Sequence, residues 1–335
     1  MTIHDRTTRL AAVAAASIFL AAATTAYEPP RRADGRPDLG GVWTNSSLTR
    51  LSRPGSVDKL VLTPEKAQQM AAGHFHNVRA AKEFEKSDPN RGAPDKVKSL
   101  PPVGNYNASW VDPGSTYGVV NGEIRSSWLI EPADGKVPYQ PIVREQGKAR
   151  RTHRSGIAGP EVLSLGERCL IGFGGTAGPP MLNVLYNNHY EIVQTDDRIM
   201  ILVEMVHDAR VVRMDADHGA AADLRWLGDS VGRWDGDTLV VETTHFHPAR
   251  STNGPLYYSA NAMVTERFTR VSDSQIHYEF IVDDPEFYTA EMRGEMSFNA
   301  VDKRVYEYAC HEGNYAMGNM LRGARLLESE ASSGR

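Results

Sequence analysis

Residues 204–218 concentrate side chains that could carry out proton transfer. An imidazole titrates near neutral pH and can exchange a proton with a substrate, and a guanidinium can hold a negatively charged oxygen. We therefore predict His207 as the general acid or base and Arg210 as the anion holder. Asp215 would orient them, and His218 would help to bind the ligand. The alternative is that these charges line a solvated hairpin.

The strand pattern in this segment constrains the hypothesis. Residues two apart on a strand share a face, so His207 and Arg210 point to opposite faces of a continuous strand. The two side chains can work together only if a turn near Asp208 resets the register.

A second polar cluster follows a predicted strand in the sequence YEYACHEGNYAMGN, residues 306–319. We predict His311 as a second candidate acid or base and Glu312 as a second orienting carboxylate. Asn314 and Tyr315 are predicted to bind the ligand. The cluster is not a zinc motif, because H-E-x-x-H would require a histidine in place of Tyr315. Capping and turn hydrogen bonds are the alternative role.

Residues 228–232, GDSVG, match the G-x-S-x-G pattern of a hydrolase nucleophile. That serine requires a strand before it and a helix after it. Here RWDGDTLVVETT follows, and Asp235-Gly236 is a hairpin signal because glycine accepts a positive φ. We predict strand, hairpin and strand, which makes Ser230 a structural residue rather than a nucleophile.

The same hairpin supplies three predicted ligand-binding residues. Trp226 and Trp234 could stack on an aromatic ligand, and Asp229 could bind it or satisfy turn amides. The alternative for both tryptophans is ordinary core packing.

Metal ligation is a weaker possibility in this sequence. His245 and His247 would share one strand face, but no third ligand stands at an obvious spacing. A site formed by His207, His218 and His311 is the other metal alternative. We predict no metal, and because no glycine-rich phosphate-binding motif occurs, no nucleotide cofactor either.

The N-terminus has the layout of a secretory signal. Arg6 and Arg9 precede an apolar run, residues 10–23, and small residues close it at Ala26. The run is shorter than the roughly 20 residues that span a bilayer. We predict a signal peptide over residues 1–26, a periplasmic protein, and no stable membrane insertion after cleavage. An uncleaved anchor is the alternative.

Composition supports a globular chain that does not bind nucleic acid. The 335 residues carry a net charge of −5 and are 41% hydrophobic, and a mean hydropathy of −0.43 excludes a polytopic membrane protein. A mildly acidic protein has no long-range attraction to nucleic acid. In an exported chain the two cysteines, Cys169 and Cys310, are predicted to form a disulfide, with two separate buried thiols as the alternative.

The order of predicted elements indicates a mainly β fold. From Tyr190 onward, short segments rich in β-branched and aromatic residues alternate with turns, up to KRVYEYACHE at 303–312. No helix of ten residues separates them, which favours antiparallel pairing. We predict one domain over 27–335, with a helix from Pro64 to Lys86 and long loops in 27–160. An antiparallel β core would occupy 161–335.

Long motifs resemble a large family of exported bacterial proteins, most of which have no assigned activity. They are RWLGDSVGRWDGDTLVVETTHF, ERFTRVSDSQIHYEFIVDDPEFYT, YEYACHEGNYAMGNMLRGAR, RPDLGGVWTN and GERCLI. The β-rich part resembles lipocalin-like barrels, including Gly41-x-Trp43 near the first strand. The resemblance implies an antiparallel lipocalin-like barrel covered by the helix and loops. The chain departs from the family pattern in VDDPEFYTAEM, where a tryptophan is expected after the threonine.

Together these features predict a cofactor-independent acid/base enzyme of the lyase, hydratase or isomerase type. Its substrate would be a small aromatic or apolar metabolite, held among a few polar groups at the barrel. A periplasmic binding or carrier protein for an apolar ligand is one alternative, and a metal-dependent hydrolase is the other.

Overall fold

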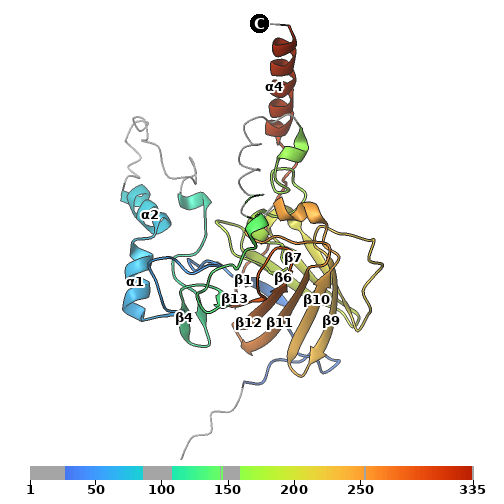
Figure 1. Ribbon diagram of the computed structural model, residues 1–335. Helices are drawn as coiled ribbons and strands as arrows, with labels where there is room; N and C mark the ends of the chain where they lie inside the picture. The colour runs from blue at the N-terminus through green and yellow to red at the C-terminus, as the bar shows by residue number, and fades with distance from the viewer. Residues whose placement is uncertain (1–26, 86–107, 144, 146–158, 253, 334–335) are drawn as a thin grey trace, which may run out of the picture.

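Nine strands form a closed barrel, which lies at the centre of the molecule in Figure 1. The computed structural model describes residues 27–85, 108–143, 145, 159–252 and 254–333; the predicted signal peptide lies outside them. The strands pair in the order given below, and β13 returns to β1 to close the ring. They are β1 (Gly41–Thr44), β6 (His189–Gln194), β7 (Arg198–Val203), β8 (Ala209–Met214), β9 (Asp229–Asp235), β10 (Thr238–Thr244), β11 (Met263–Ser272), β12 (Gln275–Asp283) and β13 (Met292–Ala300).

The mainly β prediction is confirmed, but the barrel is not wholly antiparallel. β8 and β9 run parallel and pair through Val212 with Ser230, Arg213 with Val231, and Met214 with Gly232. The reason is geometric, because a closed ring with an odd number of strands cannot alternate direction all the way round. Residues 215–228 form the crossover connection that parallel neighbours need.

The parts outside the barrel differ in several ways from the sequence-based expectation. The predicted helix from Pro64 is divided in two, although Thr63 caps it as expected, its side chain accepting a hydrogen bond from the Lys66 amide at 3.2 Å. The segment 303–312, predicted as a strand, has no regular structure. The remaining elements are α1 (Pro64–Ala72), α2 (Phe75–Glu85), α4 (Tyr315–Ser332), β2 (Val61–Leu62), β3 (Val119–Val120), β4 (Glu123–Arg125) and β5 (Leu129–Glu131), with short 3-10 turns at Ala108–Trp110, Pro160–Val162, Phe173–Gly175, Met205–His207 and Pro248–Thr252.

Helix α4 was not anticipated from the sequence. It extends away from the barrel in Figure 1, and none of its described side chains is buried. Across the described part of the chain, no helix combines the length and apolar character needed to cross a bilayer.

Two local predictions are confirmed. β9 and β10 form a hairpin whose turn includes Gly236 at φ +60, and the Ser230 hydroxyl shares a hydrogen bond with that of Thr243 at 2.8 Å. Ser230 therefore sits within a strand, without the elbow that a nucleophile requires. Cys169 and Cys310 form a disulfide across a sequence separation of 141 residues.

Aromatic side chains fill the barrel interior. Tyr278 of β12 contacts Phe268, Phe280 and Phe298, with ring centroids 4.9, 6.0 and 5.2 Å away, and Phe298 also meets Tyr190 at 5.1 Å. All five rings are almost completely buried. Because they come from four strands, they occupy the space in which a larger barrel would hold a ligand.

A buried ion pair crosses this interior. Both terminal nitrogens of Arg210 on β8 donate to the Glu266 carboxylate on β11, and the Nη1 hydrogen bond is 3.0 Å long. The Tyr278 hydroxyl donates to the same carboxylate at 2.7 Å and accepts from the Met181 amide at 3.0 Å. The Arg210 side chain is 1% exposed and that of Glu266 is fully buried. The pair therefore joins opposite parts of the barrel and fixes the loop that carries Met181.

We expect Arg210→Met to lower the free energy of unfolding by about 3–5 kcal/mol, because it leaves the Glu266 carboxylate buried without its cation. Arg233→Met is the matched control, since Arg233 pairs with Glu242 on the exposed surface and should contribute about 1 kcal/mol or less. Removing both charges, in Arg210→Met with Glu266→Met, should recover much of the loss. Urea unfolding measures all three, and equal stability of the two single variants would contradict the role of the pair.

Candidate functional site

A cavity of about 420 Å³ lies beside the parallel pair of strands. This volume falls within the range of small-molecule sites. The ladder between β8 and β9 begins only at Val212 and Ser230, so the segments before it, 207–211 and 225–228, are free to separate. We call this space the β8–β9 cavity. Its lining residues are Leu170, Ile171, His207, Asp208, Ala209, Arg210, Val211, Arg225, Trp226, Leu227, Gly228 and Ser230.

The turn between β7 and β8 places two titratable groups on this cavity. Val206 and His207 both adopt left-handed backbone, with φ of 62 and 54, and the Val203 amide donates to the Asp208 carbonyl at 2.7 Å. Positive φ is costly for a β-branched residue, by about 1–3 kcal/mol. Such strain persists only where the surroundings enforce it, often at functional sites. After this turn His207 is exposed, whereas the Arg210 guanidinium pairs with Glu266 in the interior.

Asp208 has an environment suited to proton exchange. Burial raises the pKa of its carboxyl group to about 6, although a hydrogen bond from the Gly172 amide at 2.5 Å and the charge of Arg250 act in the opposite direction. A carboxyl group with this pKa is populated in both protonation states near neutral pH, as a general acid or base must be.

His207 lies next to Asp208 on the cavity and is exposed to solvent. Its ring accepts a hydrogen bond from the Tyr308 amide at 3.3 Å. Two residues further on, Cys310 is bonded to Cys169, which directly precedes the lining residues Leu170 and Ile171. The disulfide therefore connects the segment beside His207 to another part of the cavity wall.

Asp229 anchors the opposite wall and is 2% exposed. It accepts hydrogen bonds from Arg213 at 2.7 Å, from the Gly219 amide at 2.8 Å and from Arg225 at 3.2 Å, and the His218 ring lies 3.3 Å away. Burial opposes its ionisation, but the hydrogen bonds from Gly219 and His218 and the two guanidinium groups outweigh it and hold the pKa of Asp229 below its ordinary value. The pKa of Asp229 is therefore shifted in the opposite direction to that of Asp208.

Trp226 presents an aromatic surface to the cavity. Its ring lies against that of His247, with centroids 4.2 Å apart, and its carbonyl accepts a hydrogen bond from Arg250 at 2.7 Å. The His247 ring contacts the indole and Arg250 fixes the backbone, so a flat ligand could pack on this residue with a smaller cost of ordering it.

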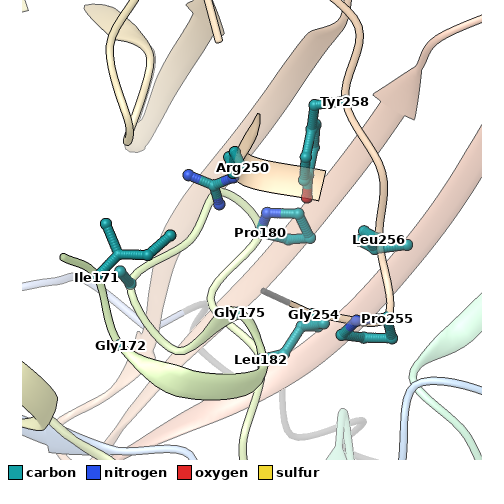
Figure 2. Close-up of a pocket in the computed structure, with 11 residues that line it drawn as sticks. Ile171, Gly172, Gly175, Pro180, Leu182, Arg250, Gly254, Pro255, Leu256 and Tyr258 are labelled. Carbon is teal, nitrogen blue, oxygen red and sulfur yellow. The ribbon is translucent and has the colours of Figure 1, made fainter. Parts of the chain in front are cut away.

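A second cavity, drawn in Figure 2, lies among Arg250, Tyr258 and Pro180. Its volume of about 10 Å³ has room for roughly one water molecule. Arg250 is buried there, donates to the Gly178 carbonyl at 2.6 Å and lies over the Tyr258 ring at 4.8 Å. Arg250 thus supports the loop 176–182, and the cavity beside it is too small for a substrate.

The structure gathers part of the predicted site. His207, Arg210 and Trp226 line the β8–β9 cavity, and Asp229 with His218 lies behind its Arg225 wall. The guanidinium of Arg210, however, is committed to Glu266 in the interior.

Besides Asp229 and His218, six predicted site residues lie away from this cavity. Asp215 is exposed and accepts from Arg36 at 3.4 Å, and Trp234 is half-buried against the barrel core. Asn314 donates toward the Cys169 sulfur at 3.8 Å. The other three are exposed residues at or just before the start of α4: His311, Glu312 and Tyr315.

Sequence reasoning gave too little weight to two residues of the cavity. Asp208 belongs to the polar cluster at 204–218 but is given no role there beyond the turn, and Arg225 is not singled out. No feature of the sequence alone identifies them, because each becomes distinctive through burial or through neighbours distant in the chain.

The described residues offer little to a metal ion. Among them, no three histidine, cysteine or carboxylate side chains are arranged to hold one. β10 ends at Thr244, so His245 and His247 do not share the strand face on which their pairing depended.

Comparisons with protein-family models, with curated proteins and with solved structures found no match for this chain. The fold therefore stands as a nine-stranded, mostly antiparallel barrel, and the function must be argued from the site.

The pH dependence of stability should distinguish the two aspartates. A carboxyl group with a raised pKa stabilises the folded state most below its unfolded pKa, near 3.8, and this is lost as the pH rises through about 6. We therefore expect Asp208→Asn to gain stability relative to the wild type across this interval. Above it, the gain should be about 1–2 kcal/mol, allowing for partial exposure.

Asp229→Asn should behave in the opposite way. The lowered pKa of Asp229 stabilises the folded state above the ordinary carboxyl pKa, and this contribution is lost as the pH falls. The loss of stability caused by Asp229→Asn should therefore be largest near neutral pH. Urea unfolding over a pH series measures both differences, and parallel curves for the two variants would refute the distinction.

Proposed function

We propose that this protein is an acid/base enzyme of the lyase, hydratase or isomerase type, acting on a small aromatic or apolar metabolite without a cofactor. The observation that carries the proposal is the pairing of His207 and Asp208 on a strained turn at a cavity of about 420 Å³. One carboxyl group with a pKa near neutrality and one imidazole can together give and take a proton.

The walls of the cavity suit such a substrate. Leu170, Ile171, Val211 and Leu227 supply apolar contacts, and Trp226 supplies an aromatic face. In this proposal His207 and Asp208 exchange protons with the substrate, while Arg210 supports the wall from the interior through Glu266. The disulfide supports export to an oxidising compartment such as the periplasm.

A periplasmic binding protein for an apolar ligand is the second candidate, and the apolar side of the same cavity favours it. Lipocalins hold their ligand inside the barrel. Here aromatic rings occupy that interior, so a carrier would also have to use the β8–β9 cavity.

Solvent deuterium incorporation tests the enzyme proposal without knowledge of the substrate. The protein is incubated in D₂O with a library of small aromatic and apolar metabolites, and mass spectrometry detects products or compounds that gain deuterium. We expect His207→Ala and Asp208→Asn to lower the rate by roughly 100-fold or more. His311→Ala and Asp235→Asn, which do not line the cavity, should keep it.

Thermal midpoints of all four variants serve as the folding control. Binding of a compound without deuterium exchange or product would favour the carrier. Equal loss in the His311 and His207 variants would place the chemistry elsewhere.

A further inference from the structure

Arg225 carries a positive charge that its neighbours do not fully compensate. Asp229 is the carboxylate it contacts, and Arg213 donates to that same carboxylate over a shorter distance, 2.7 Å against 3.2 Å. One negative charge thus balances only one of the two positive charges on Arg213 and Arg225. The Arg225 side chain is 55% exposed, and the residue lines the β8–β9 cavity.

The guanidinium has donors to spare. Arginine offers five N–H groups, and in the described part of the chain only the Nη1 group of Arg225 has a hydrogen-bond partner, the Oδ1 atom of Asp229. The remaining edge can present two parallel donors, the arrangement that binds a carboxylate most firmly.

The backbone of Arg225 is fixed in place. Its amide donates to the His245 carbonyl at 2.9 Å, and its carbonyl accepts from the His247 amide at 2.9 Å, bridging to the segment that follows β10. Trp226, next in the chain, is held by the His247 ring and by Arg250. A cation and an aromatic residue therefore line the cavity from one segment whose backbone is held in place.

The other charged groups on the cavity leave the task of anion recognition to Arg225. Arg210 is neutralised by Glu266 in the interior. His207 and Asp208 stand on the segment 207–211, whereas Arg225 and Trp226 stand on 225–228, across the gap that opens before the β8–β9 ladder. An anion held by Arg225 would direct the rest of the ligand toward His207 and Asp208.

We propose that the β8–β9 cavity selects small monocarboxylates with an aromatic or apolar body, with Arg225 binding the carboxylate and Trp226 packing on the body. That such a carboxylate is also the substrate rests on the function proposed above.

Calorimetric binding to matched pairs of probes tests this inference. Benzoate, phenylacetate and cinnamate are compared with benzamide, phenylacetamide and cinnamamide, which keep the shape but lack the charge. At least one carboxylate should bind the wild type about tenfold or more tightly than its amide. Arg225→Gln should remove that preference while leaving amide affinity unchanged, and Arg225→Lys should give an intermediate value because it keeps the charge but not the planar fork.

Arg233→Gln is the matched control, because Arg233 also has a 55% exposed side chain but does not line the cavity. It should bind as the wild type does. Equal affinity for acids and amides, no binding of any carboxylate, or an unchanged preference in Arg225→Gln and Arg225→Lys would overturn the inference. Should Arg225→Gln fail to fold, the lysine variant, which keeps a cation beside Asp229, decides the outcome.

Binding and deuterium exchange can fail separately. Carboxylate selectivity without deuterium exchange would support the binding site and contradict the proposed enzymatic activity. Exchange on neutral compounds only would support the enzymatic activity and contradict the role of Arg225 in specificity.

Discussion

Strand parity is the constraint on which the rest of this structure depends. Nine strands close the barrel, and an odd ring must contain a parallel pair, here β8 and β9. A parallel pair cannot be joined by a tight turn, so residues 215–228 must cross between the strands. The ladder is only three residue pairs long and begins at Val212 and Ser230, which leaves the chain before it open on both sides. The β8–β9 cavity occupies that opening.

Charge placement then divides the polar groups around this opening into structural and reactive ones. The pair of Arg210 and Glu266 is buried, and both terminal nitrogens of Arg210 are bonded to the carboxylate, so the pair holds the wall from the interior. Asp229 is equally buried, yet its cations and the Gly219 amide keep it ionised. Asp208 has weaker compensation, and burial dominates its titration. Asp208 on the cavity and Asp229 behind its Arg225 wall thus have pKa values shifted in opposite directions, which is how acid/base sites separate roles among like residues.

The sequence was informative wherever local chemistry decides the outcome. Alternating β-branched segments located the strands, Asp235-Gly236 located the hairpin that excludes Ser230, and two cysteines in a chain with a predicted signal indicated the disulfide. The parallel pair and its cavity depend on ring closure and burial. Strand number is a property of the whole sheet, so neither feature could be predicted from local sequence patterns. Arg210 is predicted as an anion holder, and only the structure shows that its guanidinium pairs with Glu266 on β11.

The cavity is built from three regions that are far apart in the chain, and each restrains another. The disulfide ties Cys169, beside Leu170 and Ile171, to Cys310, and the nearby Tyr308 amide contacts His207. His207 belongs to a turn in which Val206 and His207 both have positive φ. Glycine or asparagine would adopt this backbone with less strain. An unrestrained hairpin would gain stability by relaxing such a turn. Because the neighbouring segments hold it, the strained geometry persists, and it keeps the imidazole and the Asp208 carboxyl group on the same side of the cavity.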